Sequence, residues 1–128
     1  RSIEGENPLY LPQAKTYDGA CAIGATIVIA PDAASLRNRA IRLQIERQGE
    51  TVYIGETSTA NMKRTPEELM DYLLRETAFP TGAFLFTGTG IVPPDDFTLT
   101  PGDRVTITLE GVPALVNRVG ENNLPPAN

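Results

Sequence analysis

Lys15 follows a segment that carries very few charges. The ten residues before it, 5–14 (GENPLYLPQA), contain one charged side chain, Glu6, and a run of large apolar and aromatic ones at positions 9–11. A lysine in such surroundings could lie at the surface with its stem over apolar neighbours. It could also be desolvated, with a lowered pKa, and then transfer protons or bind an anion. The residue types leave both interpretations open.

Two acidic residues lie near the start of this segment, Glu4 just before it and Glu6 within it. Because they are spaced by two, their side chains would share one face of an extended chain. A hard cation such as Mg²⁺ takes about six oxygen ligands, so two glutamates by themselves do not make a metal site. They are interpreted either as a solvated pair or as part of a larger ligand set.

The stretch FTGTG, residues 86–90, places two threonine hydroxyls between glycines at the end of an apolar run. Hydroxyls and backbone N–H groups in such a turn can face an anionic ligand. The stretch is neither a G-x-G-x-x-G motif nor a phosphate-binding loop, because the lysine and the spacing of that loop are missing. The alternative interpretation is a tight turn without a ligand.

The composition limits the chemistry further. The 128 residues contain no histidine, so this chain alone cannot build a Ser-His-Asp site, a Cys-His site or an imidazole-based zinc site. Acid–base chemistry therefore falls to Lys, Asp, Glu, Tyr or the single cysteine, Cys21, which is interpreted as a small core residue. The net charge of −5 and the scattered cations disfavour nucleic acid as a partner. No apolar run approaches the roughly 18 residues of a membrane span.

The elements that must position these side chains are mostly strands. Apolar or alternating runs predict strands at residues 20–30, 41–46, 51–54, 82–92, 105–109 and 114–119. The turn signal at Gln48 and Gly49 joins the second and third of these runs into a predicted β-hairpin. One helix is predicted after Thr65, with Pro66 at its first position and Glu68 completing a T-x-x-E capping box.

Three motifs in this order resemble the carboxyl-terminal catalytic part of the fumarylacetoacetate hydrolase family. They are RSIEGENPLYLPQAKTYDGACAIG (residues 1–24), FLFTGTGIVPP (84–94) and FTLTPGDRVTITLEGVPALVNRV (97–119). In that family a D-x-S-x-R segment leads into a loop that ends in a lysine, and a strand ending in T-G-T precedes an L-x-P-G-D hairpin with L-x-N-x-V. The versions EGENPLYLPQAK and TGTGIVPP resemble the branch that dehydrates 2-keto-3-deoxy sugar acids, the 2-dehydro-3-deoxy-pentonate dehydratases.

The resemblance implies a divalent metal, usually Mg²⁺ but also Mn²⁺ or Ca²⁺, that holds a 2-oxo acid through its carboxylate and keto oxygens. It implies that Lys15 is the catalytic proton carrier beside this metal and that Thr87 contacts the substrate. Arg1 matches the arginine that follows the metal-binding aspartate, and it is a candidate substrate-binding residue. Glu4 stands where relatives often carry a substrate-contacting glutamine, so a substrate contact is expected there too, although the change of residue type leaves its role open.

The metal ligands of the family, two glutamates and an aspartate, have no match in these 128 residues and are expected upstream of Arg1. The chain, which begins with Arg and not Met, is therefore expected to be a fragment. The resemblance implies a β-rich α+β fold: a mixed β-roll with one main helix, incomplete at its N-terminal side. Residues 1–128 would form a single partial catalytic domain.

The expected function of the parent protein is metal-dependent dehydration of a 2-keto-3-deoxy sugar acid, a lyase reaction, with the isolated chain inactive. Two alternatives are kept. One is hydrolysis, decarboxylation or isomerisation of a diketo acid within the same family, and the other is a non-catalytic fragment or assembly module. The expected partner is a small-molecule 2-oxo acid, and neither nucleic acid nor a membrane is expected as a partner. The parent protein is expected to be a homodimer in the cytoplasm.

Overall fold

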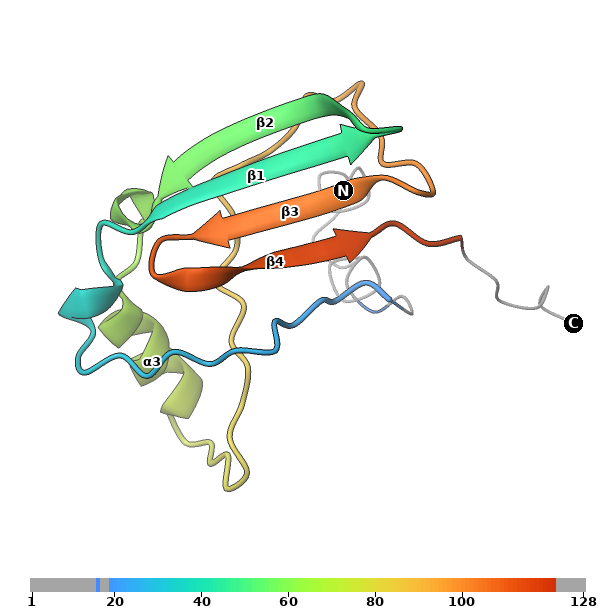
Figure 1. Cartoon of the computed structure of the whole chain (residues 1–128). Helices are drawn as coiled ribbons and strands as arrows, with labels where there is room; N and C mark the ends of the chain where they lie inside the picture. Colours follow the sequence, from blue (N-terminus) through green and yellow to red (C-terminus); the bar gives the residue numbers. More distant parts are fainter. Residues whose placement is uncertain (1–15, 17–18, 122–128) are drawn as a thin grey trace, which may run out of the picture.

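The fold is built on a four-stranded antiparallel sheet (Figure 1). The structure is a computed structural model, and it describes Thr16 and residues 19–121. The strands are β1 (Ala40–Arg47), β2 (Glu50–Ser58), β3 (Arg104–Leu109) and β4 (Val112–Arg118). Their order across the sheet is β2-β1-β3-β4, and each of these neighbours pairs antiparallel.

The β1–β2 hairpin forms where the sequence predicts it. Its two turn residues, Gln48 and Gly49, have φ angles of 53° and 87°, the left-handed pair that a two-residue hairpin turn requires. The register shifts between Ile45 and Glu46, which pair with Tyr53 and Thr51, so one residue of β2 bulges out. Both strands extend beyond their predicted ends.

The small apolar core of the described residues lies on one face of the sheet. Ile45 in β1 is 3 % exposed, and Ile91, from the segment before β3, is 8 % exposed; they are the only buried apolar side chains in the described part of the chain. Tyr53 of β2, which pairs with Ile45 of β1, contacts Phe97, and the two ring centroids are 5.6 Å apart. The segment around residues 91–97 therefore packs under the β1–β2 half of the sheet.

The helix also begins as predicted. In α3 (Pro66–Leu74) the Thr65 hydroxyl caps the first turn by accepting the backbone N–H of Glu68 at 3.2 Å. The Glu68 carboxylate, which a full capping box would direct back at Thr65, lies instead 3.6 Å from Arg64. Figure 1 shows α3 below the end of the sheet where β3 turns into β4.

Two 3₁₀ turns, η2 (Ala34–Leu36) and η3 (Thr59–Asn61), flank the β1–β2 hairpin in the chain. The only α-helix in the described residues is α3. This helix, the two 3₁₀ turns and the four-stranded sheet confirm the predicted β-rich α+β class. The mixed β-roll that the resemblance implies stays a prediction. No helix in the described part is long and apolar enough to cross a membrane.

Three sequence predictions are wrong for this chain. Residues 20–30, predicted as a buried strand, and residues 82–92, predicted as a strand, run without strand partners and are mostly exposed. A strand exists only when a neighbour satisfies its backbone, and none of the described strands lies beside either segment in the sheet. Cys21, predicted to be a small core residue, is exposed for the same reason, since nothing in the described part covers its segment.

Candidate functional site

The T-G-T-G turn, residues 87–90, gives its two threonines different surroundings. The Thr89 hydroxyl accepts the backbone N–H of Ile91 at 3.0 Å and donates to the carbonyl of the same residue at 3.2 Å. Gly88, between the threonines, has a φ of 85°, which favours glycine. The Thr87 side chain is exposed, and its hydroxyl has no hydrogen-bond partner among the described residues. Thr89 therefore fixes the turn, whereas Thr87 can meet a ligand.

Two glycines allow this turn to sit close against the sheet. A β-carbon on Gly55 in β2 would overlap the side chain of Ile91 and lie 2.9 Å from the hydroxyl of Tyr53. A β-carbon on Gly90 would lie 3.0 Å from the hydroxyl oxygen of Thr57, which also accepts a hydrogen bond from Asn61 at 3.2 Å. Sequence reasoning missed Gly55 as a positioning residue, because the close approach joins segments far apart in the chain.

Replacing Gly55 by Ala should displace Ile91 and destabilise the chain. Overpacking of this kind costs about 1–3 kcal/mol, and the displaced Ile91 carries the turn that presents Thr87. We expect a lower urea midpoint for Gly55→Ala with an unchanged m-value. The matched control is Gly120→Ala, since a β-carbon there meets no atom within 4 Å. Equal midpoints for the two variants would contradict the close packing of Ile91 on β2.

Thr87 lines a groove of about 500 Å³. The groove lies between α3, the 28–31 segment, the Leu85–Thr87 stretch and the β3–β4 turn, and its wall is mostly apolar. Its polar side chains are Ser35, Arg39, Thr59, Thr87 and Glu110.

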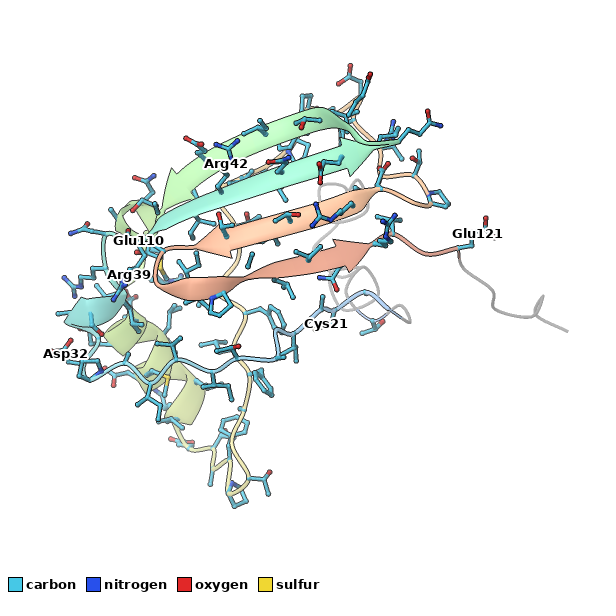
Figure 2. The ribbon with its side chains drawn as sticks, in the orientation of Figure 1. Cys21, Asp32, Arg39, Arg42, Glu110 and Glu121 are labelled. Carbon is cyan, nitrogen blue, oxygen red and sulfur yellow. The ribbon has the colours of Figure 1, made fainter. Side chains whose placement is uncertain are left out.

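The two charged side chains of the groove form hydrogen bonds with backbone groups and do not face the interior of the groove. Figure 2 shows Arg39 and Glu110 beside each other at the β3–β4 turn. Arg39 donates to the Ser35 carbonyl at 2.8 Å and to the Glu110 carbonyl at 3.4 Å, and the Glu110 carboxylate accepts the Ala40 backbone N–H at 3.2 Å. Among the described residues the groove thus offers one unengaged hydroxyl, that of Thr87, and no spare proton-transfer group.

The described residues do not fit a metal centre. No group of three or more Asp, Glu, Cys or His side chains in residues 16 and 19–121 lies close enough to hold an ion. Mg²⁺ needs several oxygen ligands in near-octahedral geometry, so this part of the chain supplies no cage for it. Of the predicted site residues, only Thr87 is described. Arg1, Glu4 and Lys15 lie outside the described residues, as does Glu6.

A second polar cluster, at the opposite end of the sheet, is structural. Asp103, of the L-x-P-G-D motif, is 1 % exposed. Its carboxylate accepts two hydrogen bonds from Arg47, both at 2.9 Å, and the backbone N–H of Thr100 at 2.9 Å. These bonds hold the turn before β3 against the end of β1. No sequence pattern indicates this pair, because its members lie 56 residues apart.

The Arg47 hydrogen bonds, and then the Thr100 N–H, hold the pKa of Asp103 well below its usual range. A carboxyl group with a depressed folded-state pKa contributes stability above its unfolded pKa of about 4. That contribution is lost as the pH falls from there towards the folded value.

Asp103→Asn should therefore unfold more readily than the unchanged chain at pH 7, with a smaller difference at pH 3. Asparagine keeps the shape but loses the charge that Arg47 pairs with. Urea midpoints at the two pH values measure this, and Asp96→Asn, in an exposed turn, is the control. A gap between Asp103→Asn and the unchanged chain that is equally wide at both pH values would contradict the charge pairing.

The family follows from these motifs and from a family model. The model for the fumarylacetoacetate (FAA) hydrolase C-terminal region matches residues 1–120. The chain belongs to the fumarylacetoacetate hydrolase family. The match includes the Lys15 segment, the T-G-T-G turn and the L-x-P-G-D turn described above.

Two named relatives lie in the dehydratase branch. Over 119 residues, 93 % of this chain, it is 46 % identical to a Haloferax volcanii protein named "Probable 2-keto-3-deoxyxylonate dehydratase". Over the same length it is 41 % identical to the 2-dehydro-3-deoxy-D-arabinonate dehydratase of Saccharolobus solfataricus. The matches cover 41 % and 40 % of those proteins, so the chain spans less than half of their length.

Solved structures agree with this branch. A 2-keto-3-deoxy-D-arabinonate dehydratase complexed with magnesium and 2,5-dioxopentanoate matches 95 % of this chain with a TM-score of 0.88 and 40 % identity. The apo form of a 2-keto-3-deoxy-D-arabinonate dehydratase matches 97 % with a TM-score of 0.89. This chain covers 43 % and 44 % of those two chains.

Proposed function

We propose that the chain is the carboxyl-terminal part of a metal-dependent lyase that dehydrates a 2-keto-3-deoxy sugar acid. The observation that carries the proposal is the likeness, 40 % identity and a TM-score of 0.88 over 95 % of the chain, to a dehydratase bound to magnesium and 2,5-dioxopentanoate. The two named relatives support the same substrate class, a small 2-oxo acid. Residues 1–128 act as a single part of the catalytic domain, within a mixed β-roll that the rest of the protein completes.

In this proposal the reaction removes a proton from C3, beside the 2-oxo group, and hydroxide from the adjacent carbon, which together leave as water. Lys15 carries the proton, and Thr87 donates a hydrogen bond to a substrate oxygen. The exposed Thr87 hydroxyl, with no partner in the described residues while Thr89 is engaged, supports this division of roles. Arg1 and Glu4 are proposed substrate contacts. Mg²⁺, or Mn²⁺ or Ca²⁺, is held by oxygen ligands outside the described residues.

The test is a protein in which this chain replaces the matched part of the Saccharolobus solfataricus relative; we call it the joined protein. We expect it to dehydrate 2-keto-3-deoxy-pentonates when Mg²⁺ is supplied. A panel of 2-oxo acids that includes diketo acids separates dehydration from hydrolysis, decarboxylation and isomerisation. Turnover of a diketo acid alone, or a folded joined protein that turns over none of the panel, would overturn the proposal.

The mass of the joined protein in solution tests the proposed homodimer, and fractionation of cells that produce the native parent tests the proposed cytoplasmic location.

The isolated 128-residue chain should bind Mg²⁺ weakly and show no turnover. Its described residues hold no cluster of three potential ligands. The three carboxylates outside them, those of Glu4, Glu6 and Asp18, supply only half of the roughly six oxygens that Mg²⁺ takes when each binds through one oxygen. Calorimetric titration of the chain with MgCl₂ measures this. A tight site with one Mg²⁺ per chain would place the metal ligands within these residues, against the proposal.

A further inference from the structure

Three charged side chains form a row across one end of the sheet. Glu46 of β1 pairs with Arg104 of β3, and Arg104 pairs with Arg118 of β4. Residues paired directly across antiparallel strands point to the same face, with β-carbons about 4.5–5.5 Å apart. Figure 1 shows this end of the sheet, where β1 ends and β3 begins, on the side away from α3. One acidic side chain is thus followed by two basic ones.

The acidic side chain pairs with only the nearer arginine. Arg104 donates a hydrogen bond from Nη1 to Oε2 of Glu46 at 2.7 Å. Arg118 forms no ion pair and no side-chain hydrogen bond with any described residue. Like charges directly opposite each other destabilise a sheet. A negative group between the two guanidinium groups would remove that repulsion.

The two arginines also have hydrogen-bond donors to offer. A guanidinium group carries a planar fork of N–H donors, of which Arg104 uses one nitrogen on Glu46 and Arg118 uses none on the described residues. Carboxylate and phosphate oxygens accept such hydrogen bonds, often two from one guanidinium group. The chemistry of this pair therefore fits a small oxyanion and excludes a cation.

Both arginines line a hollow of about 330 Å³ at this end of the sheet. One water molecule takes up about 30 Å³ in the liquid, so the hollow has room for a phosphate or a small carboxylate. Gly49 and Gly102, from the turns beside it, also line it, and a β-carbon on either would meet no atom within 4 Å. The backbone of these turns thus leaves the hollow open.

The other charged side chains of the hollow do not compete for the ligand. Asp103 is 1 % exposed, and both of its carboxylate oxygens accept hydrogen bonds from Arg47. Arg47 also donates to the carbonyl of Thr98 at 2.9 Å. The Arg47–Asp103 and Arg104–Glu46 pairs are each neutral, so the charge of Arg118 is in excess. The hollow is therefore locally positive in a chain whose net charge is −5.

We propose that this end of the sheet binds a small oxyanion, a phosphate or a carboxylate group, between Arg104 and Arg118. Arg118 supplies the unpaired positive charge, and Arg104 supplies the donors that Glu46 does not take. The site is separate from the Thr87 groove, which lies beside the β3–β4 turn at the other end of these strands. The inference rests on this geometry and not on the proposed reaction.

The experiment is calorimetric titration of the joined protein with sodium phosphate and, separately, with sodium succinate. Mg²⁺ and substrate are left out, and sodium chloride keeps the ionic strength constant because salt screens exposed charges. We expect one site per chain with a dissociation constant of about 1 mM or tighter for at least one of the two ions. The ion that binds more tightly identifies the oxyanion as phosphate or carboxylate.

Two variants and one control assign the binding to this site. Arg118→Gln should weaken it at least about tenfold, because the unpaired charge and its hydrogen bonds are lost. Arg118→Lys keeps the charge without the planar fork, so its affinity should fall between the two. Arg42→Gln is the matched control: Arg42 is 47 % exposed, against 46 % for Arg104, pairs with Glu56 and does not line the hollow. Its affinity should be unchanged.

Three results would overturn the inference. They are no binding of either ion at about 10 mM, equal affinities of Arg118→Gln and Arg42→Gln, or binding to the isolated chain that is lost in the joined protein. The last would mean that another part of the parent covers Arg118. Because the titration needs neither Mg²⁺ nor turnover, a joined protein that binds the ion but dehydrates nothing would count against the proposed reaction alone. An active joined protein without the anion site would count against this inference alone.

Discussion

Replacing Lys15 by Met in the joined protein is expected to lower kcat by on the order of 10²–10⁴, the contribution of a positioned acid–base group. Methionine keeps much of the apolar stem and deletes the ammonium group and its transferable protons. Folding and Mg²⁺ binding should survive, since the change adds neither a cavity nor a buried charge. If Lys15 were only a surface residue, the rate would be nearly unchanged and the stability would stay within about ±0.5 kcal/mol.

The chain offers a matched control for this variant. Its other lysine, Lys63, is exposed, and Lys63→Met should leave kcat unchanged. Lys15→Arg adds a separate check, because arginine keeps a cation but holds its proton too tightly to act as a base. Near-normal turnover of Lys15→Met or Lys15→Arg would falsify the proton-transfer role and leave Lys15, at most, an anion contact.

Local signals predicted the parts of the fold that local contacts stabilise. The β1–β2 hairpin needs only alternating side chains and two turn residues with positive φ, and Gln48 and Gly49 provide them. The start of α3 needs a hydroxyl at Thr65 and a proline after it. In both cases the interacting atoms lie within a few residues of each other, so the local sequence pattern is enough to predict the contact.

Prediction failed where the partner is distant in the chain. The runs at 20–30 and 82–92 have the composition of strands, but composition cannot provide the neighbour that pairs with them. The Arg47–Asp103 pair and the contact of Gly55 with Ile91 join segments that only the sheet order β2-β1-β3-β4 brings together. A single sequence carries no signal for such contacts.

The candidate site divides in the same way. The T-G-T-G turn was identified from its residue types, and the structure adds which threonine is engaged, since Thr89 bonds to Ile91. Lys15, Glu4 and Arg1 were assigned from a resemblance, and they lie outside the described residues, so their roles stay predictions. No set of metal ligands could be predicted within these 128 residues, because none of them matches the two glutamates and the aspartate that bind the metal in the family.

The two threonines of the turn should respond to the same substitution in opposite ways. Thr87→Val in the joined protein removes a hydrogen bond to a charged ligand, which costs about 1.5–3 kcal/mol, so kcat/KM should fall roughly 10- to 150-fold. Its stability should hold, because the lost hydroxyl has no partner among the described residues. Thr89→Val instead breaks the hydrogen bonds to Ile91, each contributing about 0.5–1.5 kcal/mol, so the urea midpoint should fall.

Comparing the two variants separates substrate contact from turn stability, since valine has the same shape at both positions. A turn that merely loosens would lower activity in proportion to stability, with Thr89→Val the worse variant in both measurements. A substrate contact at Thr87 makes Thr87→Val the worse variant in kcat/KM and the better one in urea. Unchanged kinetics for Thr87→Val together with a large loss for Thr89→Val would move the contact to Thr89. In that case the Thr89 hydroxyl would have to leave the Ile91 backbone to reach the substrate, and the turn would be less ordered in the joined protein with substrate bound than in this structure.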